Sequence, residues 1–156
     1  MRIAISDAET PRVCRLHARA RRALEACARR PEERAPSAAD VLPESCGVLI
    51  GTRAGPELCV LEARRTPNLD PRPGRFLVDP GAIAQHDRAA CERGLELVGF
   101  FHTHPRGRAT PSRADRDGAW DGHVVVVATS ARIGAHWPVA SGFASLAVEH
   151  LAEDHA

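Results

Sequence analysis

The sequence of 156 residues contains no lysine, and all 21 of its basic residues are arginine. Two explanations stay open. The base composition of the genome accounts for such a bias, and the abundance of alanine, glycine and proline points the same way. Alternatively, a protein that works beside a system conjugating proteins to lysine benefits from offering no acceptor lysine. Because composition does not separate the two, this absence predicts no function by itself.

Long apolar runs and an excess of charge are also missing. No apolar run reaches the roughly 20 residues that cross a membrane, and residues 1–6 lack the apolar segment of a signal peptide. The formal net charge of +1 gives no overall electrostatic case for binding nucleic acid or a membrane surface. We therefore expect one cytoplasmic domain over residues 1–156, with neither nucleic acid nor membrane as its partner.

The cysteines are odd in number and show no C-x-x-C spacing. A disulfide framework needs pairs, so we expect free thiols or small buried apolar residues instead. Cys46 lies two residues after Glu44, but we expect it to pack inside its strand rather than act as a nucleophile. The five are Cys14, Cys27, Cys46, Cys59 and Cys91.

Apolar periodicity and turn residues predict an α/β (α+β) fold in which one mixed sheet is flanked by helices. The segments 31–42 and 66–75 are rich in proline or charge and are expected to be loops, and the tail 151–156 is expected to fray. The predicted helices cover 11–30, 80–94 and 112–120, and the predicted strands cover 2–5, 46–50, 57–63, 95–101, 123–129, 132–139 and 143–150.

The predicted helix at 11–30 is unusually rich in arginine. Apolar residues such as Leu16, Ala20 and Leu24 fall on one face at helical spacing, and arginines occupy the rest. We favour a solvated cationic face for this helix. The alternative is a surface that docks an acidic patch of a partner protein.

The most specific feature is the run His-Thr-His-Pro at residues 102–105, directly after the predicted strand 95–101. Side chains alternate between the two faces of a strand, so His102 and His104 are expected to point the same way and Thr103 the opposite way. The proline lacks an N–H and ends the strand. The other histidines lack ligand spacing, and His123 and His136 are interpreted as polar ends of strands.

A hydroxyl and a carboxylate follow this run. Ser112 is expected to cap a short helix whose first turn contains Asp115, which brings the carboxylate back toward the two imidazoles. Two histidines and one carboxylate suit a catalytic zinc, because three protein ligands leave a fourth position for water. Ser112 is then close enough to donate to a developing oxyanion.

Hydrolysis also needs a proton acceptor, and none is evident inside the run. Upstream, Glu44 opens a short apolar strand that ends at Gly51. A glutamate at the entrance of a buried strand can line a cleft. The spacing alone is equally compatible with an ordinary solvated glutamate.

Taken together, residues 41–140 resemble the JAMM (MPN-plus) zinc metalloproteases. The signature of that family is a glutamate before a C-G-[VIL]-L-x-G strand, then H-[ST]-H-P, then S-x-x-D. This sequence has Glu44 before Cys-Gly-Val-Leu-Ile-Gly at 46–51, His-Thr-His-Pro at 102–105, and Ser-Arg-Ala-Asp at 112–115. Every catalytic position of the pattern is filled, with threonine in place of the commoner serine at 103.

The resemblance implies a single JAMM/MPN domain with a cytidine-deaminase-like core, its catalytic part at about 41–150. It implies one zinc held by His102, His104 and Asp115, with Glu44 as general acid/base and Ser112 steadying the tetrahedral intermediate. The implied activity, that of compact standalone prokaryotic members, is hydrolysis after the Gly-Gly tail of a ubiquitin-like or sulfur-carrier protein. The alternatives are a non-catalytic MPN scaffold, a nucleic-acid-associated role, and a hydrolase of a small-molecule amide.

Overall fold

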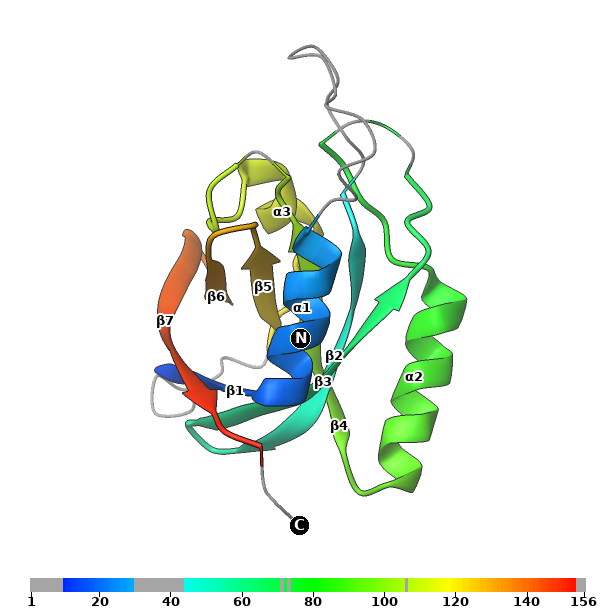
Figure 1. The fold of residues 1–156 in the computed structure, drawn as a ribbon, viewed down its shortest axis with the longest axis vertical. Helices are drawn as coiled ribbons and strands as arrows, with labels where there is room; N and C mark the ends of the chain where they lie inside the picture. The colour runs from blue at the N-terminus through cyan, green and yellow to red at the C-terminus, as the bar shows by residue number, and fades with distance from the viewer. Residues whose placement is uncertain (1–9, 30–43, 71, 73, 106, 154–156) are drawn as a thin grey trace.

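A computed structural model describes residues 10–29, 44–70, 72, 74–105 and 107–153, and it confirms the expected mixture of strands and helices (Figure 1). The predicted strand at 2–5 and the whole of the predicted loop at 31–42 lie outside these residues. In chain order the elements are β1 (Val13–His17), α1 (Ala18–Ala28), β2 (Cys46–Ala54), β3 (Glu57–Thr66), α2 (Pro80–Glu92), β4 (Glu96–Thr103), α3 (Arg113–Gly118), β5 (Val124–Ala128), β6 (Ile133–Val139) and β7 (Gly142–Leu151).

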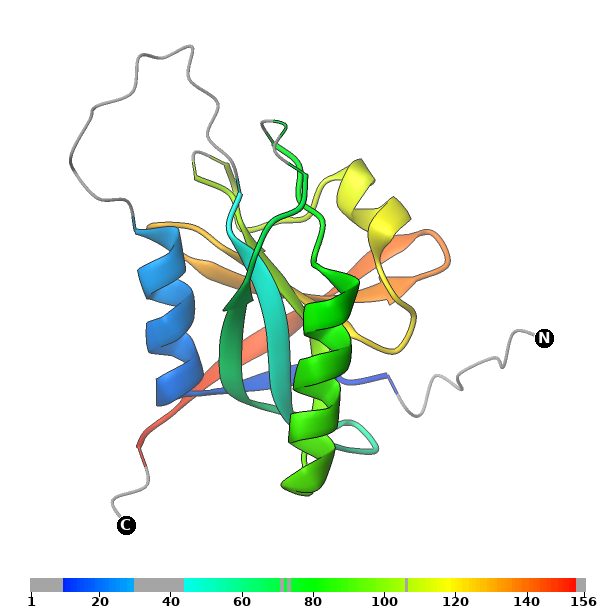
Figure 2. The same cartoon turned by 90° about the vertical axis from the view of Figure 1, so that its right-hand side faces the viewer.

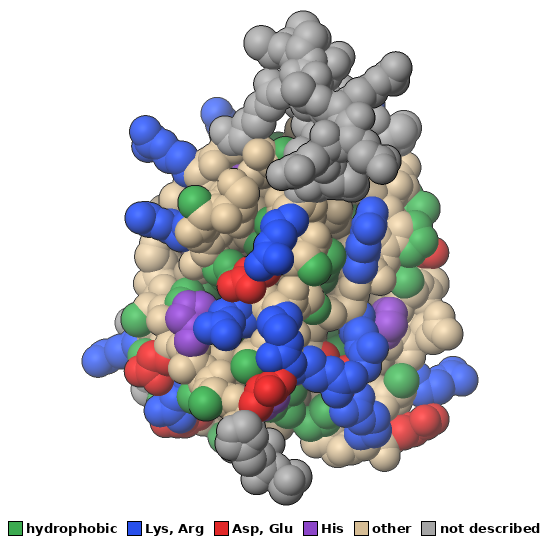
Figure 3. All heavy atoms as spheres, viewed as in Figure 1, with side chains coloured by type: hydrophobic (Ala, Val, Ile, Leu, Met, Phe, Trp, Pro, Cys, Tyr) green, Lys and Arg blue, Asp and Glu red, His purple; other side chains and the backbone are tan. Residues whose placement is uncertain are grey.

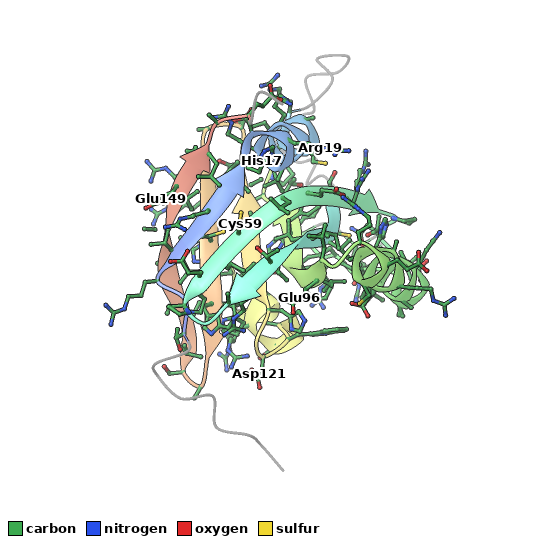
Figure 4. The ribbon with its side chains drawn as sticks, turned by 90° about the horizontal axis from the view of Figure 1, so that it is seen from below. His17, Arg19, Cys59, Glu96, Asp121 and Glu149 are labelled. Atoms are coloured by element: carbon green, nitrogen blue, oxygen red, sulfur yellow. The ribbon has the colours of Figure 1, made fainter. Side chains whose placement is uncertain are left out.

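The strands form one mixed sheet that closes on itself in the order β1-β3-β2-β4-β5-β6-β7. Pairing is parallel where β1 meets β3 and β7 and where β4 meets β5, and antiparallel elsewhere. Seen from below, β1 lies between β7 and β3, the strands on which Glu149 and Cys59 are labelled (Figure 4). The candidate site lies where the central strands β2 and β4 pair, with Glu44 just before β2 and His102 on β4.

Apolar side chains are buried on both faces of this sheet. Leu49 and Phe101 join the cluster that includes Leu24 of α1, whereas Val48 joins the cluster that includes Ala90 of α2. The two helices accordingly lie on opposite sides of the sheet (Figure 2). Because both faces are covered, β5 can be a continuous apolar run with every residue buried, as its sequence predicted.

The helix predicted over 11–30 is wrong in its first third, because residues 13–17 form β1. Their burial alternates with a period of two, and Cys14 and Leu16 point into the core. Pairing with β3 on one side and β7 on the other satisfies the backbone of β1 along its length. The helix starts only at Ala18, where His17 acts as N-cap and accepts a hydrogen bond from the Arg19 N–H.

The remaining elements were predicted with the correct type. The predicted strands 46–50 and 57–63 are longer in the structure, and Asp79 caps α2 ahead of Pro80. β4 includes the first histidine of the run at 102–105, so that side chain is fixed by the sheet rather than by a loop. Within the described residues, no helix has the length and apolar character needed to cross a membrane.

The five cysteines are free thiols, as expected. Cys46 is fully buried in β2, where its sulfur lies 4.0 Å from the Thr66 hydroxyl. Burial raises the pKa of this thiol, which keeps it protonated and a poor nucleophile. The prediction that Cys46 packs inside its strand is confirmed.

The arginines of α1 lie over the face of the molecule shown in Figure 3, interspersed with acidic side chains. Arg19 pairs with Glu62 of β3, and Arg22 pairs with Glu153 near the end of the described chain. Both arginines are more than half exposed although Glu62 is buried, and a pair exposed at both ends, such as Arg22 with Glu153, contributes little stability. They fit the solvated face that we favoured, and the docking alternative stays a prediction.

Candidate metal centre

The pairing of β2 with β4 brings the upstream glutamate to the histidines. Cys46 lies opposite His102 in this antiparallel pair. One residue further out, the Thr103 N–H donates to the Ser45 carbonyl, and the Ser45 N–H donates to the Thr103 hydroxyl. Glu44, the next residue, therefore lies beside His104, with 3.7 Å between Glu44 Oε1 and His104 Nε2.

Three donor atoms converge at this end of β4, and they come from the residues that the sequence predicted. Nε2 of His102 lies 3.1 Å from Nε2 of His104 and 3.0 Å from Oδ2 of Asp115. The third side of this triangle, from His104 Nε2 to Asp115 Oδ2, is 3.5 Å. Ligands placed tetrahedrally around zinc at about 2.0–2.1 Å lie roughly 3.3–3.4 Å from one another, so the triangle fits a zinc ion.

Glu44 completes the group, since one ligand atom from each of the four side chains lies within 4.8 Å of the others. These side chains are largely shielded from solvent: 6% exposed for Glu44, 1% for His102, 14% for His104 and 7% for Asp115. Nδ1 of His102 and Oε2 of Glu44 are buried without a hydrogen-bond partner in the described part of the chain. The group could hold a metal ion, because a buried set of imidazoles and carboxylates is stabilised by a cation at its centre.

The two carboxyl groups of the site differ in their protonation. Burial opposes ionisation of Asp115, but hydrogen bonds from His102 and His104 outweigh it and hold its pKa well below the usual range. Burial raises the pKa of Glu44 to about 7. The negative charge of Asp115 also raises this pKa, whereas the nearby His104 lowers it. Asp115 is therefore ionised at neutral pH, whereas Glu44 changes its protonation state near neutral pH. This division is typical of acid–base sites.

The two imidazoles are oriented in different ways. The Phe76 ring stacks on His102, with ring centroids 4.3 Å apart and planes 16° from parallel. Nδ1 of His104 lies 2.8 Å from the Arg108 carbonyl, a contact in which Nδ1–H donates. Hydrogen bonding to Asp115 raises the pKa of His104. Burial lowers the pKa of His102, which favours the neutral form that a metal requires.

The interpretation of His136 as a polar strand end is wrong. It lies within β6, is 5% exposed, and its Nε2 is 2.8 Å from the Ala109 carbonyl. Ala109 also packs against Gly134, where a Cβ atom would lie 2.1 Å from the same carbonyl oxygen. Through these contacts β6 holds in place the loop that contains Arg108, whose carbonyl contacts His104. His123, by contrast, does precede a strand, β5, as predicted.

Ser112 is the N-cap of α3 and forms a capping box with Asp115. The Asp115 N–H donates to the Ser112 hydroxyl oxygen at 3.2 Å, and the Ser112 N–H donates to Asp115 Oδ2 at 2.6 Å. This cap fixes the carboxylate that faces His102. The Ser112 hydroxyl can still donate its own proton, and its role toward an oxyanion stays a prediction.

An apolar pocket of about 340 Å³ opens beside the site, with His102 and Asp115 at its edge. Its walls come from the loop after β3, the start of α2, and the segment that follows α3. The ring of Trp120 meets Phe100 of β4 edge-on, with centroids 4.9 Å apart. Trp120 is nevertheless 48% exposed and lines the pocket, as does Leu77, which is 52% exposed.

Asn68, Phe76 and His136 contribute to the site but were not identified from the sequence. Each acts on a residue at least seven positions away in the chain, through a contact that no local spacing encodes. The available signals were weak: Asn68 is the only asparagine of the chain, and it lies in a proline-rich loop.

Residues 7–140 match the family described as prokaryotic homologs of the JAB domain, and the chain belongs to this family. The resemblance inferred from the three sequence motifs is confirmed at this level.

Three curated relatives are similar in sequence. The desampylase of Haloferax volcanii is 30% identical over 114 residues, which cover 72% of this chain and 81% of that protein. A probable TtuB-protein conjugate cleaving protease of Thermus thermophilus is 35% identical over 40% of this chain and 44% of its own length. The CD-NTase/cGAS isopeptidase of Vibrio cholerae is 40% identical over 53% of this chain and 55% of its own length, so the chain spans about half of these last two relatives.

Two solved structures share the fold. A protein from Desulfitobacterium hafniense, determined in solution, superposes with a TM-score of 0.74 over 90% of this chain and 94% of its own, at 24% identity. A protein from Salinibacter ruber gives a TM-score of 0.50 at 27% identity, covering 71% of this chain and 78% of its own. Because the Desulfitobacterium hafniense protein is only 24% identical to this chain, its likeness shows the fold alone.

The contact between β6 and the ligand loop gives a first prediction. His136→Leu should lower the free energy of unfolding by about 1–3 kcal/mol, because the buried Ala109 carbonyl loses its donor. The measurement is urea denaturation. His123→Leu is the control, since the half-buried His123 ring hydrogen-bonds, among the described residues, only to the carbonyl of Asp121, two residues away, and its contacts with Phe100 and Trp120 are ones that a leucine can partly replace. Equal destabilisation by the two changes would contradict the assigned contact.

Proposed function

We propose that this protein is a zinc-dependent isopeptidase or peptidase that hydrolyses the bond after the C-terminal Gly-Gly tail of a ubiquitin-like or sulfur-carrier protein. The observation that carries the proposal is the convergence of Glu44, His102, His104 and Asp115 within 4.8 Å. Family membership supports it. So do the names of the relatives, which describe the removal of conjugated proteins.

His102, His104 and Asp115 would hold one zinc ion per chain. When bound there, zinc supplies a Lewis acid that polarises a carbonyl and lowers the pKa of water to about 7. The three ligands come from the end of β4 and the first turn of α3, two elements fixed by the sheet and by a capping box. Such rigid placement favours a pre-formed site.

Glu44 would act as general base and then as general acid. Its pKa of about 7 allows Oε2 to take a proton from the attacking water and return it to the leaving amine at neutral pH. That oxygen meets no hydrogen-bond partner in the described residues, so its lone pairs are free to accept a proton. Ser112 would donate its hydroxyl proton to the oxyanion that develops on the scissile carbonyl.

The apolar pocket would receive the residues that precede the glycines of the tail. An extended Gly-Gly segment has no side chains, so it can pass close to the histidines where a bulkier segment would not fit. An apolar side chain upstream of it could then contact Leu77 and Trp120, whose exposed surfaces face the pocket. Burial of one such side chain is worth about 1.5–3 kcal/mol.

A non-catalytic scaffold of the MPN type is less well supported. Such members usually have lost ligands, whereas this chain keeps all four groups and holds them together. The raised pKa of Glu44 also reflects a costly burial that a scaffold does not need.

Metal analysis tests the ligand set directly. We expect about one zinc per chain in the purified protein and a melting temperature that falls when a chelator removes it. His104→Ala should lose both the metal and the response to the chelator. His150→Ala is the control, because His150 is exposed on β7, outside the group. Retention of stoichiometric zinc by His104→Ala would refute the ligand assignment.

Cleavage assays test the reaction. Fusions of candidate ubiquitin-like proteins that end in Gly-Gly are incubated with zinc-loaded protein, and the cut is located by mass spectrometry. Glu44→Gln should retain zinc but lose at least about a hundredfold in kcat, because general acid–base catalysis typically contributes that much. Cleavage at an undiminished rate would show that another group is the base.

A matched pair of leucines tests the pocket. Leu77→Ser should raise KM about tenfold and lower kcat by a smaller factor, because most of the contact that it removes is shared by substrate and transition state. Leu69→Ser is the control: it changes an equally exposed leucine of the same loop that does not line the pocket. An equal effect of both variants would place the tail elsewhere.

A further inference from the structure

The side chain of Asn68 is saturated with hydrogen bonds. Its Nδ2 donates to the Glu44 carbonyl at 2.9 Å and to the Arg75 carbonyl at 3.1 Å. Its Oδ1 accepts from the N–H groups of Asp70 and Leu77, each at 2.9 Å. A side-chain amide has two N–H donors and two lone pairs on oxygen. Every one of these is used, and every partner is a backbone group.

These bonds link Glu44 to the pocket loop, in addition to the pairing of Cys46 with Thr66 and the contact of the Cys46 sulfur with the Pro67 carbonyl. The Glu44 carbonyl belongs to the segment that enters β2, whereas Asp70, Arg75 and Leu77 belong to the loop that forms one wall of the pocket. Backbone contacts also close this loop, since the Leu69 N–H donates to the Leu77 carbonyl at 2.9 Å. No backbone bond of the loop reaches Glu44 among the contacts of the described residues.

Among the described residues, two hydrogen-bonded contacts hold the backbone around Glu44. On its C-terminal side, Ser45 is fixed to Thr103 by hydrogen bonds in both directions. At its own carbonyl, the fixed point is Asn68. The carboxylate of Glu44 has no hydrogen bond at Oε2, so the backbone sets its position relative to His104.

We propose that Asn68 is a positioning residue that holds the backbone of Glu44 and the pocket wall in one rigid unit. This role rests on the proposed function, because it assigns a purpose to the placement of the base. Small displacements of a reacting group cost much of the rate, and a shift of about 1 Å can cost a hundredfold. Asn68 touches none of the three zinc ligands, which lie on β4, on α3 and between them.

Asn68→Asp distinguishes the hydrogen bonds that the Asn68 side chain donates from those that it accepts. The carboxylate keeps acceptors for the N–H groups of Asp70 and Leu77, but it has no donor for the carbonyls of Glu44 and Arg75. Asn68→Ala removes the same donors without adding a charge. Arg72→Ala is the control on the same loop, because it removes only the exposed pair between Arg72 and Asp70.

The experiment measures kcat and KM on a Gly-Gly fusion that the zinc-loaded wild type cleaves, together with zinc affinity by competition with a chromophoric chelator. Both Asn68 variants should lose about tenfold to a hundredfold in kcat, with a smaller change in KM and zinc affinity within about threefold of wild type. Arg72→Ala should match the wild type. A kcat within about threefold of wild type, or a parallel loss of zinc, overturns the proposal.

Hydrogen exchange keeps this test separate from that of the function. In the zinc-loaded Asn68 variants, the amides of residues 44–46 and 69–77 should exchange faster than in wild type, while those of β4 should not change. Failure of the wild type to cleave any fusion would refute the proposed function and leave this measurement valid. Unchanged exchange in both segments overturns the positioning role. So does loss of cooperative unfolding in both variants, which would make Asn68 a requirement of the fold itself.

Discussion

The register between β2 and β4 is the constraint on which the site depends. Cys46 lies opposite His102, and the reciprocal hydrogen bonds between Ser45 and Thr103 extend this pairing by one residue. A slip of one residue would turn every side chain of β2 to the other face and move Glu44 away from the histidines. Gly47 permits this close pairing, since a Cβ atom there would lie 2.6 Å from the Phe101 side chain of β4 and 2.0 Å from the Arg64 carbonyl oxygen of β3.

That register gathers two carboxyl groups and two imidazoles in a space largely closed to solvent. Charges held in such a space repel or attract strongly, so the protein must neutralise them with protons or a cation. Asp115 remains ionised because hydrogen bonds compensate for its burial, and Glu44 is the group whose pKa rises. The same crowding that favours a cation therefore also brings the pKa of Glu44 close to neutral pH.

The sequence predicted most of the fold because both faces of the sheet are covered, which leaves continuous apolar runs such as Val124–Ala128. The run at 102–105 revealed part of the site because alternation along one strand is a local rule. β1 was missed because Leu16, Ala20 and Leu24 also fit a helix. What decides in favour of a strand is pairing with residues 57–60 and 147–151, which no local pattern reveals.

The residues that orient the site were missed for the same reason. His136 acts on a carbonyl 27 positions away, and Phe76 stacks on a ring 26 positions away. Their side chains have ordinary alternative roles in a core, and only the folded chain shows which contact each makes. Ligand chemistry leaves a signal in sequence because it demands particular residue types, whereas orientation can be achieved by many.

If Asn68 links the pocket wall to Glu44, substrate binding in the pocket can affect the alignment of the general base. A substrate that fills the space beside Leu77 presses on the loop whose carbonyls and N–H groups Asn68 holds, and the same amide holds the base. Binding energy from the tail can then be expressed in kcat, because it stabilises the geometry in which the base is aligned. In such a site, selectivity for the tail is exercised partly in the chemical step and not only in affinity.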